Sequence, residues 1–130
     1  MQKKYCIILL LTLTCLCLSQ SQPPEKESRL PSDCYGIVEE TVKDQCFMDQ
    51  GRSTRNTAYC DQIKGREAYE MCLGGVAEGT GNLSLCESLQ ISVVKDDCIR
   101  GVAAYHKDFE LCKKIKDTSI KSTCYAYSRG

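Results

Sequence analysis

The sequence contains no tryptophan, a single histidine and only three prolines. The prolines, Pro23, Pro24 and Pro31, all precede residue 32, so no later segment carries this helix-breaking residue. The histidine, His106, has no paired nucleophile nearby in the sequence and gives little basis for catalysis. Strand-like alternation of apolar and polar residues is also missing, which argues against a β fold.

The chain has no excess of charge, with 17 basic and 17 acidic residues. Removal of Lys3 and Lys4 with an expected leader leaves 15 basic residues against 17 acidic ones, a net charge near −2. This balance lacks the excess of positive charge that is typical of proteins that bind nucleic acid. The charged residues of segment 33–50 are five acids and one lysine, whereas the segment from Lys107 onward has six bases against three acids. This asymmetry motivates the prediction of head-to-tail self-association.

Residues 1–19 have the layout of a secretory signal peptide. Lys3 and Lys4 precede an uncharged apolar run over residues 5–18, which is shorter than the ~20 residues that a membrane-spanning helix needs. We therefore predict no membrane span in the mature chain and a secreted or extracytoplasmic location (periplasmic, extracellular or surface-tethered). A lipoprotein acylated at Cys15 or Cys17 is the less favoured alternative, because the residue at the usual leucine position is wrong.

The segment 20–33 is polar and holds all three prolines, so we expect a disordered, Pro-rich tether. Three of the eleven cysteines fall within the leader. The other eight are separated alternately by 12 and 14 residues, which defines a repeat of 26 residues. The predicted repeat domain spans 34–130, in four units: 34–59, 60–85, 86–111 and 112–130.

Other residues recur with the same period. Asn56, Asn82 and Asp108 stand four residues before a cysteine and are good N-caps for a short helix. Gly65 is suited to end such a helix, and Ser92 and Thr118 are candidate N-caps for a longer second helix. The sequence therefore predicts an all-α fold, a short α-solenoid of four 26-residue helical hairpins. Gly75 and Gly101 recur in register and suggest close approach of stacked hairpins.

An even number of cysteines in an exported chain indicates a disulfide framework. The repeat symmetry leaves two pairing schemes, across hairpins or within them. Pairing across hairpins would leave Cys34 and Cys124 at opposite ends of the array, whereas pairing within hairpins gives every cysteine a nearby partner. The expected bridges are Cys34–Cys46, Cys60–Cys72, Cys86–Cys98 and Cys112–Cys124. Zinc binding is less favoured because the mature chain has no closely spaced cysteine pair, and we predict no metal and no cofactor.

Two further features have simple structural explanations. Asn82-Leu83-Ser84 is a glycosylation sequon, but N-capping accounts for Asn82 without glycosylation, which stays an additional prediction. Asp96 and Asp97 lie in the first turns of an expected helix, where acidic side chains favour the helix dipole.

The array, through its Cys-x2-Ile/Leu and Cys-x3-Val-Ala elements between Cys34 and Gly130, resembles tetratricopeptide and Sel1-like helical-hairpin solenoids in architecture. It is also similar to the disulfide-stapled hairpin repeats of small exported proteins. It departs from the tetratricopeptide pattern in its period, 26 instead of about 34, and in lacking that family's Trp and Pro positions. The resemblance implies right-handed stacking and protein binding, and it transfers no functional residue.

We therefore expect a non-enzymatic, secreted or cell-surface module for protein interaction or scaffolding, with an unknown protein partner. Solenoids present extended surfaces and not one reactive pocket, which favours this function. The competing hypothesis is an exported metal- or thiol-binding protein that uses its cysteines. An enzyme with an unrecognised site is the third.

Overall fold

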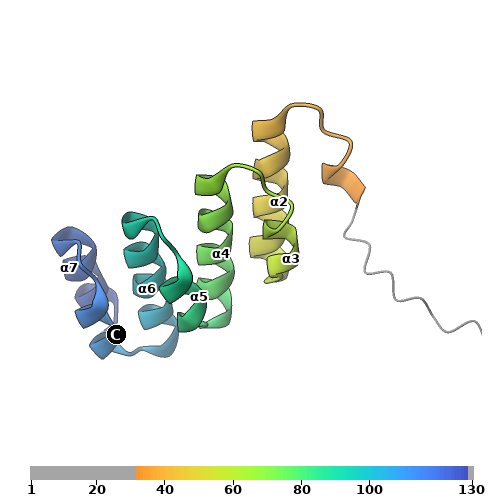
Figure 1. Cartoon of the computed structure of the whole chain (residues 1–130). Helices are drawn as coiled ribbons and strands as arrows, with labels where there is room; N and C mark the ends of the chain where they lie inside the picture. Colours follow the sequence, from red (N-terminus) through yellow and green to blue (C-terminus); the bar gives the residue numbers. More distant parts are fainter. Residues whose placement is uncertain (1–31, 129–130) are drawn as a thin grey trace, which may run out of the picture.

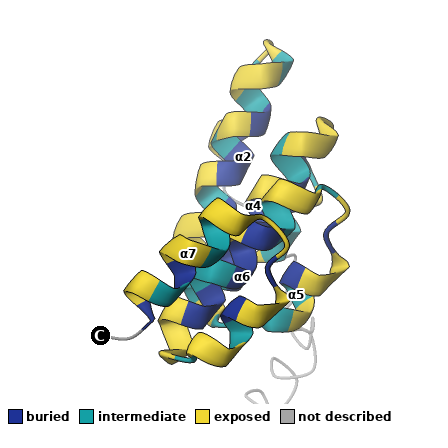
Figure 2. Cartoon of the chain, turned by 90° about the vertical axis from the view of Figure 1, so that its left-hand side faces the viewer, coloured by how far each residue is buried: buried dark blue, intermediate teal, exposed yellow. Residues whose placement is uncertain are grey.

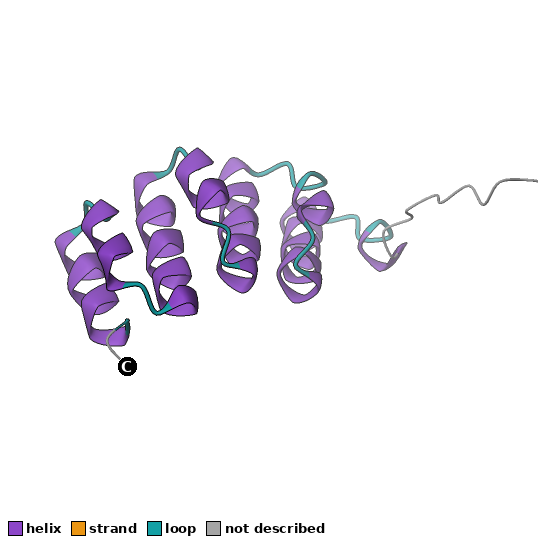
Figure 3. Ribbon diagram, turned by 90° about the horizontal axis from the view of Figure 1, so that it is seen from below, coloured by secondary structure: helices purple, strands orange, loops and turns teal. Residues whose placement is uncertain are grey.

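The computed structural model describes residues 32–128, and all secondary structure in that range is helical (Figure 3). The expected leader and residues 20–31 of the expected tether lie outside this range. The elements are η1 (Ser32–Cys34), α2 (Glu40–Thr54), α3 (Thr57–Cys60), α4 (Arg66–Thr80), α5 (Leu83–Ser88), α6 (Ser92–His106), η2 (Phe109–Lys114) and α7 (Thr118–Tyr127). None of these helices has the length and apolarity that crossing a membrane requires.

The elements form four hairpins, each of one short and one long helix: η1 with α2, α3 with α4, α5 with α6, and η2 with α7. The long helices stand in a row in chain order, and each packs against the next (Figure 1). The predicted all-α solenoid of four hairpins, each with one disulfide, is thus confirmed.

The short helices begin where their N-caps were predicted. The side-chain oxygens of Asn56, Asn82 and Asp108 accept hydrogen bonds from the backbone N–H two residues on, at 3.0, 3.1 and 3.0 Å. These bonds satisfy N–H groups that have no partner within the helix. The short helices are not alike: that of the fourth hairpin is a 3-10 helix, and α3 has only four residues.

The starts of α6 and α7 differ from the prediction by one residue. The N-caps of α6 and α7 are Ile91 and Asp117, and Ser92 and Thr118 are the first helical residues. Gly65 likewise does not end α3, which stops at Cys60, but occupies the N-cap position of α4. The N–H of each of these N-cap residues is bound by a contact from the preceding hairpin, described below. Gly65 and Ile91 make no side-chain cap bond of their own, whereas Asp117 also caps α7 with its side chain.

The predicted unit boundaries also need correction. Boundaries placed before Cys60 and Cys86 cut through α3 and α5, whereas each structural unit begins at an N-cap such as Asn56 or Asn82. Ser32 and Asp33, expected in the tether, belong to the 3-10 turn that also contains Cys34.

The four disulfides lie inside the stack. The structure joins the cysteines within each hairpin: Cys34–Cys46, Cys60–Cys72, Cys86–Cys98 and Cys112–Cys124. A Cβ added at Gly51 would lie 2.7 Å from the Cys72 sulfur, so the bridge of the second hairpin packs directly on the backbone of α2. Each bridge therefore serves as a core side chain as well as a covalent link.

The rest of the core is built from periodic apolar residues. Leu73 and Ile99 repeat the position of Phe47 at the 26-residue period. Ile63, Leu89 and Ile115 each stand three residues after the first cysteine of their hairpin. Figure 2 shows buried residues on the sides of the long helices that face the rest of the stack. Ile63, Leu89 and Ile115 lie in the turns that follow the short helices. A hairpin alone would expose this surface, so stacking supplies most of the apolar burial.

We expect the Cys34–Cys46 bridge to be reduced before the other three. Cys46 is only half-buried, whereas each of the other seven paired cysteines is at most 1% exposed. Disulfide exchange requires a thiolate to reach the sulfur, so access should set the order. Brief treatment with a mild phosphine followed by alkylation and peptide mapping measures that order. Labelling of Cys86 or Cys98 ahead of Cys46 would contradict the prediction.

Candidate functional site

Two features of the described residues combine charged groups with burial: a series of carboxylates between hairpins, and a groove on the long helices. The first begins with Asp44, Glu70 and Asp96, which are 6%, 4% and 3% exposed. They are spaced 26 residues apart, two residues before the second cysteine of each unit. We call these three residues the carboxylate clamps.

Each clamp binds the turn of the following hairpin. Asp44 accepts from the backbone N–H groups of Lys64 and Gly65 at 3.1 and 2.8 Å. Glu70 accepts from Gln90 and Ile91 at 2.8 and 2.7 Å.

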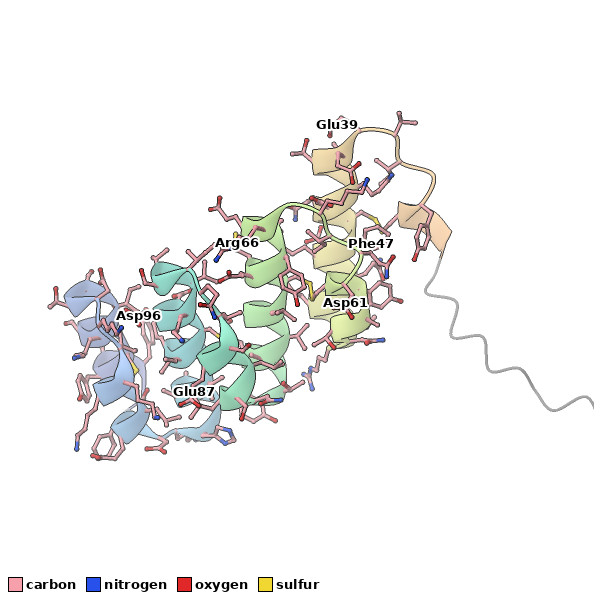
Figure 4. The ribbon with its side chains drawn as sticks, in the orientation of Figure 1. Glu39, Phe47, Asp61, Arg66, Glu87 and Asp96 are labelled. Carbon is pink, nitrogen blue, oxygen red and sulfur yellow. A yellow bond between two sulfur atoms is a disulfide. The ribbon has the colours of Figure 1, made fainter. Side chains whose placement is uncertain are left out.

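Asp96 completes the series, accepting from Lys116 and Asp117 at 3.0 and 2.7 Å. Figure 4 shows it on the side of α6 that faces α7. Since the second N–H in every pair belongs to the N-cap residue, the clamps set where α4, α6 and α7 begin. Asp96 was predicted to complement the dipole of its own helix, and that interpretation is wrong because its carboxylate binds the next hairpin.

The fourth position of the series holds Ser122, which is exposed. The turn of the first hairpin, correspondingly, has no hairpin before it among the described residues. The clamps therefore number one for each interface between consecutive hairpins. A second copy stacked on α7 in the same register would meet a serine where the internal interfaces have a carboxylate, and head-to-tail association stays a prediction.

The hydrogen bonds of Glu70 affect its titration. Burial by itself would raise the pKa of the Glu70 carboxyl, but the N–H groups of Ile91 and Gln90 and the guanidinium of Arg66 outweigh burial and lower this pKa below its ordinary value of 4.5. The Arg66 Nε lies 3.4 Å from the carboxylate. The ionised form is therefore the one that holds the two hairpins together.

We expect acid to destabilise the stack through Glu70. Because the pKa is lower in the folded chain than in the unfolded one, the stabilisation is present above about pH 4.5 and is lost as the pH falls through the folded pKa. Urea unfolding followed by circular dichroism at about pH 6 and about pH 2.5 measures the loss. The loss should be smaller in Glu70→Gln, which cannot ionise there. An equal loss in both proteins would contradict the assignment.

The second feature is a groove of about 330 Å³ on the long helices, which we call the long-helix groove. The short helices contribute no residue to it. It is lined by Arg52 of α2, by Glu67, Met71, Gly74, Gly75 and Glu78 of α4, by Val93, Val94 and Asp97 of α6, and by Ile120 of α7. It therefore extends over all four hairpins and exists only in the stacked array.

Close approach of the long helices shapes this groove. A Cβ at Gly75 would collide with the side chain of Arg52, and one at Gly101 would collide with Glu78. Both glycines were predicted to permit close stacking, and the structure confirms it. The long side chains of one helix thus lie across the backbone of the next, at positions 26 residues apart.

The groove combines apolar walls with charge. Met71 and Val93 are 39% and 58% exposed, although both are apolar. Burial raises the pKa of the Glu78 carboxyl, and the nearby Asp97 raises it further, while Arg100 and Arg52 offset part of the effect. Asp97 itself pairs with Arg100 at 2.8 Å.

The other residues singled out in the sequence have structural roles. Asn82 caps α5, and its glycosylation stays a prediction. His106 ends α6, and its Nε2 lies 2.8 Å from the carbonyl oxygen of Gly81, which joins the ends of the second and third hairpins. Sequence reasoning missed the carboxylate clamps, although an acid two residues before three of the four second cysteines was a visible signal. It also missed the groove, because Arg52 and Glu78 share a repeat position but differ in charge, and Glu67 and Asp97 have no charged residue in phase with them.

No protein-family model, no curated protein and no solved structure matches this chain.

Proposed function

We propose that this protein is a non-enzymatic, secreted or cell-surface interaction module that binds a protein partner through the long-helix groove. The observation that carries the proposal is the exposure of Met71 and Val93 beside the charged lining of a groove formed by four stacked hairpins. Exposed apolar surface framed by polar groups is characteristic of binding sites. The architectural resemblance to tetratricopeptide and Sel1-like solenoids, which present such surfaces, supports the same function.

The cysteines favour this function over metal or thiol binding. Every cysteine within the described range is in a disulfide, so that range offers no thiolate to a ligand in this state. All but Cys46 are also buried. A structural role in the core explains them fully, and disulfides of this kind persist in oxidising compartments. The signal-peptide pattern of residues 1–19 supports the same location.

Site-specific photo-crosslinking in the native host tests the proposal. A benzophenone amino acid replaces Val93 in the groove, and a control protein carries it at Ser88, an exposed residue of the short helix α5. We expect a discrete cross-linked protein at Val93 and none at Ser88. Met71→Asp, at an exposed position, should leave folding unchanged and reduce the Val93 product several-fold. Equal cross-linking at both positions, or none at Val93, would refute the proposal.

A further inference from the structure

The charges of the long-helix groove do not balance. Three acidic side chains line it, Glu67, Glu78 and Asp97, against one basic side chain, Arg52. Arg100 lies just outside the lining and pairs with Asp97 at 2.8 Å. With that pair counted as neutral, two carboxylates face one guanidinium, which leaves one excess negative charge. A bound group that carried one positive charge would balance it.

Glu78 is the carboxylate best placed to receive that charge. Its side chain lies across Gly101, so its aliphatic part is held against α6 while it lines the groove. It is only partly exposed, and no hydrogen bond or ion pair joins its carboxylate to another described residue. A partly buried ion without a partner is costly, and a cation that enters the groove would recover part of that cost.

The groove also offers apolar contact, about two helical turns before Glu78 on α4 and near the start of α6. Met71 of α4 and Val93 of α6 are exposed apolar residues of the lining. The volume, about 330 Å³, is at the small end of the range of about 300–1,000 Å³ for ligand sites and suits one or two side chains of a partner. No group of three or more potential metal-ligating side chains occurs among the described residues, so a cationic side chain fits the groove better than a metal ion.

We infer that the long-helix groove recognises a lysine or arginine side chain of the partner, which pairs with Glu78 while adjacent apolar residues of the partner pack on Met71 and Val93. This inference rests on the proposed function and names the chemistry that the groove selects. Arg52, across the groove, limits the selected charge to a single cation and disfavours strongly basic segments.

Three short peptides test the selectivity directly: acetyl-Leu-Lys-Leu-amide, its glutamine analogue and its glutamate analogue. The oxidised, ¹⁵N-labelled protein is titrated with each at low ionic strength, and backbone amide shifts are followed by NMR. We expect the lysine peptide to shift Gly75, Val93 and Asp97, and to bind about fivefold or more tightly than the glutamine peptide, since charge-assisted bonds exceed neutral ones. The glutamate peptide should bind most weakly.

Two variants locate the effect. Glu78→Gln keeps the shape that packs on Gly101 but removes the charge, so it should abolish the preference for lysine over glutamine. Asp61→Asn removes an exposed acid at the end of the short helix α3 and should leave the preference unchanged. Equal binding of the three peptides, shifts confined to other surfaces, or a preference that survives Glu78→Gln would each overturn the inference.

The two proposals fail separately. A cross-linked partner at Val93 together with no selectivity for the lysine peptide would retain the proposed function and reject the cationic anchor. Loss of the Val93 cross-link in Met71→Asp but not in Glu78→Gln would reject the cationic anchor in the same way, with the natural partner in place of a peptide.

Discussion

Replacement of Glu70 with alanine is expected to lower the free energy of unfolding by about 2–4 kcal/mol, because the substitution leaves two backbone N–H groups in the interface without an acceptor. These are the groups of Gln90 and Ile91, now 2.8 and 2.7 Å from the carboxylate. The effect should exceed that of an ordinary surface ion pair, since Glu70 is 4% exposed and bonded to the backbone of another hairpin. Equilibrium urea unfolding followed by circular dichroism measures the change.

The chain supplies a matched control. Ser122 occupies the same register position in the fourth hairpin and is exposed, and the described residues contain no hairpin after it. Ser122→Ala should change the free energy of unfolding by less than about 0.5 kcal/mol. Asp44→Ala and Asp96→Ala should lower the free energy of unfolding by a similar amount, because each leaves an equivalent pair of backbone N–H groups without an acceptor. If Glu70→Ala were as harmless as Ser122→Ala, the clamps would not hold the stack together.

Removal of the Cys86–Cys98 bridge is expected to cost about 3–5 kcal/mol. The paired cysteines are 12 residues apart, and closing a loop of this size removes entropy from the unfolded chain worth about 3 kcal/mol in the usual model. Replacing both residues with alanine also removes buried sulfur atoms from the core, where Cys98 contacts the Gly74 carbonyl oxygen at 3.6 Å. This double variant should lose a large fraction of the about 5–15 kcal/mol that stabilises a typical domain.

The loss of stability on removing a disulfide should depend on where its hairpin stands in the array. The double variant at Cys34 and Cys46 removes the bridge of the first hairpin, where Cys46 is half-buried and the short element is a single 3-10 turn. Among the described residues the first hairpin packs against only one other hairpin. Loss of its disulfide should therefore unfold that hairpin alone and leave the others folded. Thermal unfolding should therefore show a clearly larger fall in Tm for the interior variant. The reverse order would contradict the assignment of the interior bridges to the core.

The cysteine spacing made most of the fold predictable. A 26-residue period, N-caps at Asn56 and Asn82, and the absence of proline after Pro31 together indicate tandem helical hairpins. These features act through local physics: capping needs only a short polar side chain, and a disulfide within a hairpin needs only antiparallel helices of matched length.

The errors arose where one hairpin determines the structure of the next. Ser92 has a good N-cap side chain, yet the N-cap of α6 is Ile91, whose N–H binds Glu70. Thr118 likewise follows the N-cap of α7, Asp117, whose N–H binds Asp96 and whose own side chain caps the helix. Capping by a side chain 21 residues away is invisible to local propensity. The recurring acid was nevertheless in the sequence, at residues 44, 70 and 96, with Ser122 in the same place in the fourth described unit.

The long-helix groove could not be predicted from the sequence, for a different reason. Its lining draws on all four long helices, and only their stacking brings Arg52, Glu78 and Asp97 together. The glycines that permit the stacking were recognised at 75 and 101, but the side chains that cross them, Arg52 and Glu78, differ in charge and gave no periodic signal. A function that depends on the groove therefore had to come from the structure.

Disulfide mapping of the native, unreduced protein tests most directly whether each hairpin is bridged to itself. No lysine or arginine lies between Cys72 and Cys86, so the digest needs cleavage after Glu78 as well as trypsin. The hairpin architecture predicts that the peptide containing Cys72 is joined to the one containing Cys60, and that containing Cys86 to that containing Cys98. A linked pair that joined Cys72 to Cys86 would contradict this architecture and everything built on it.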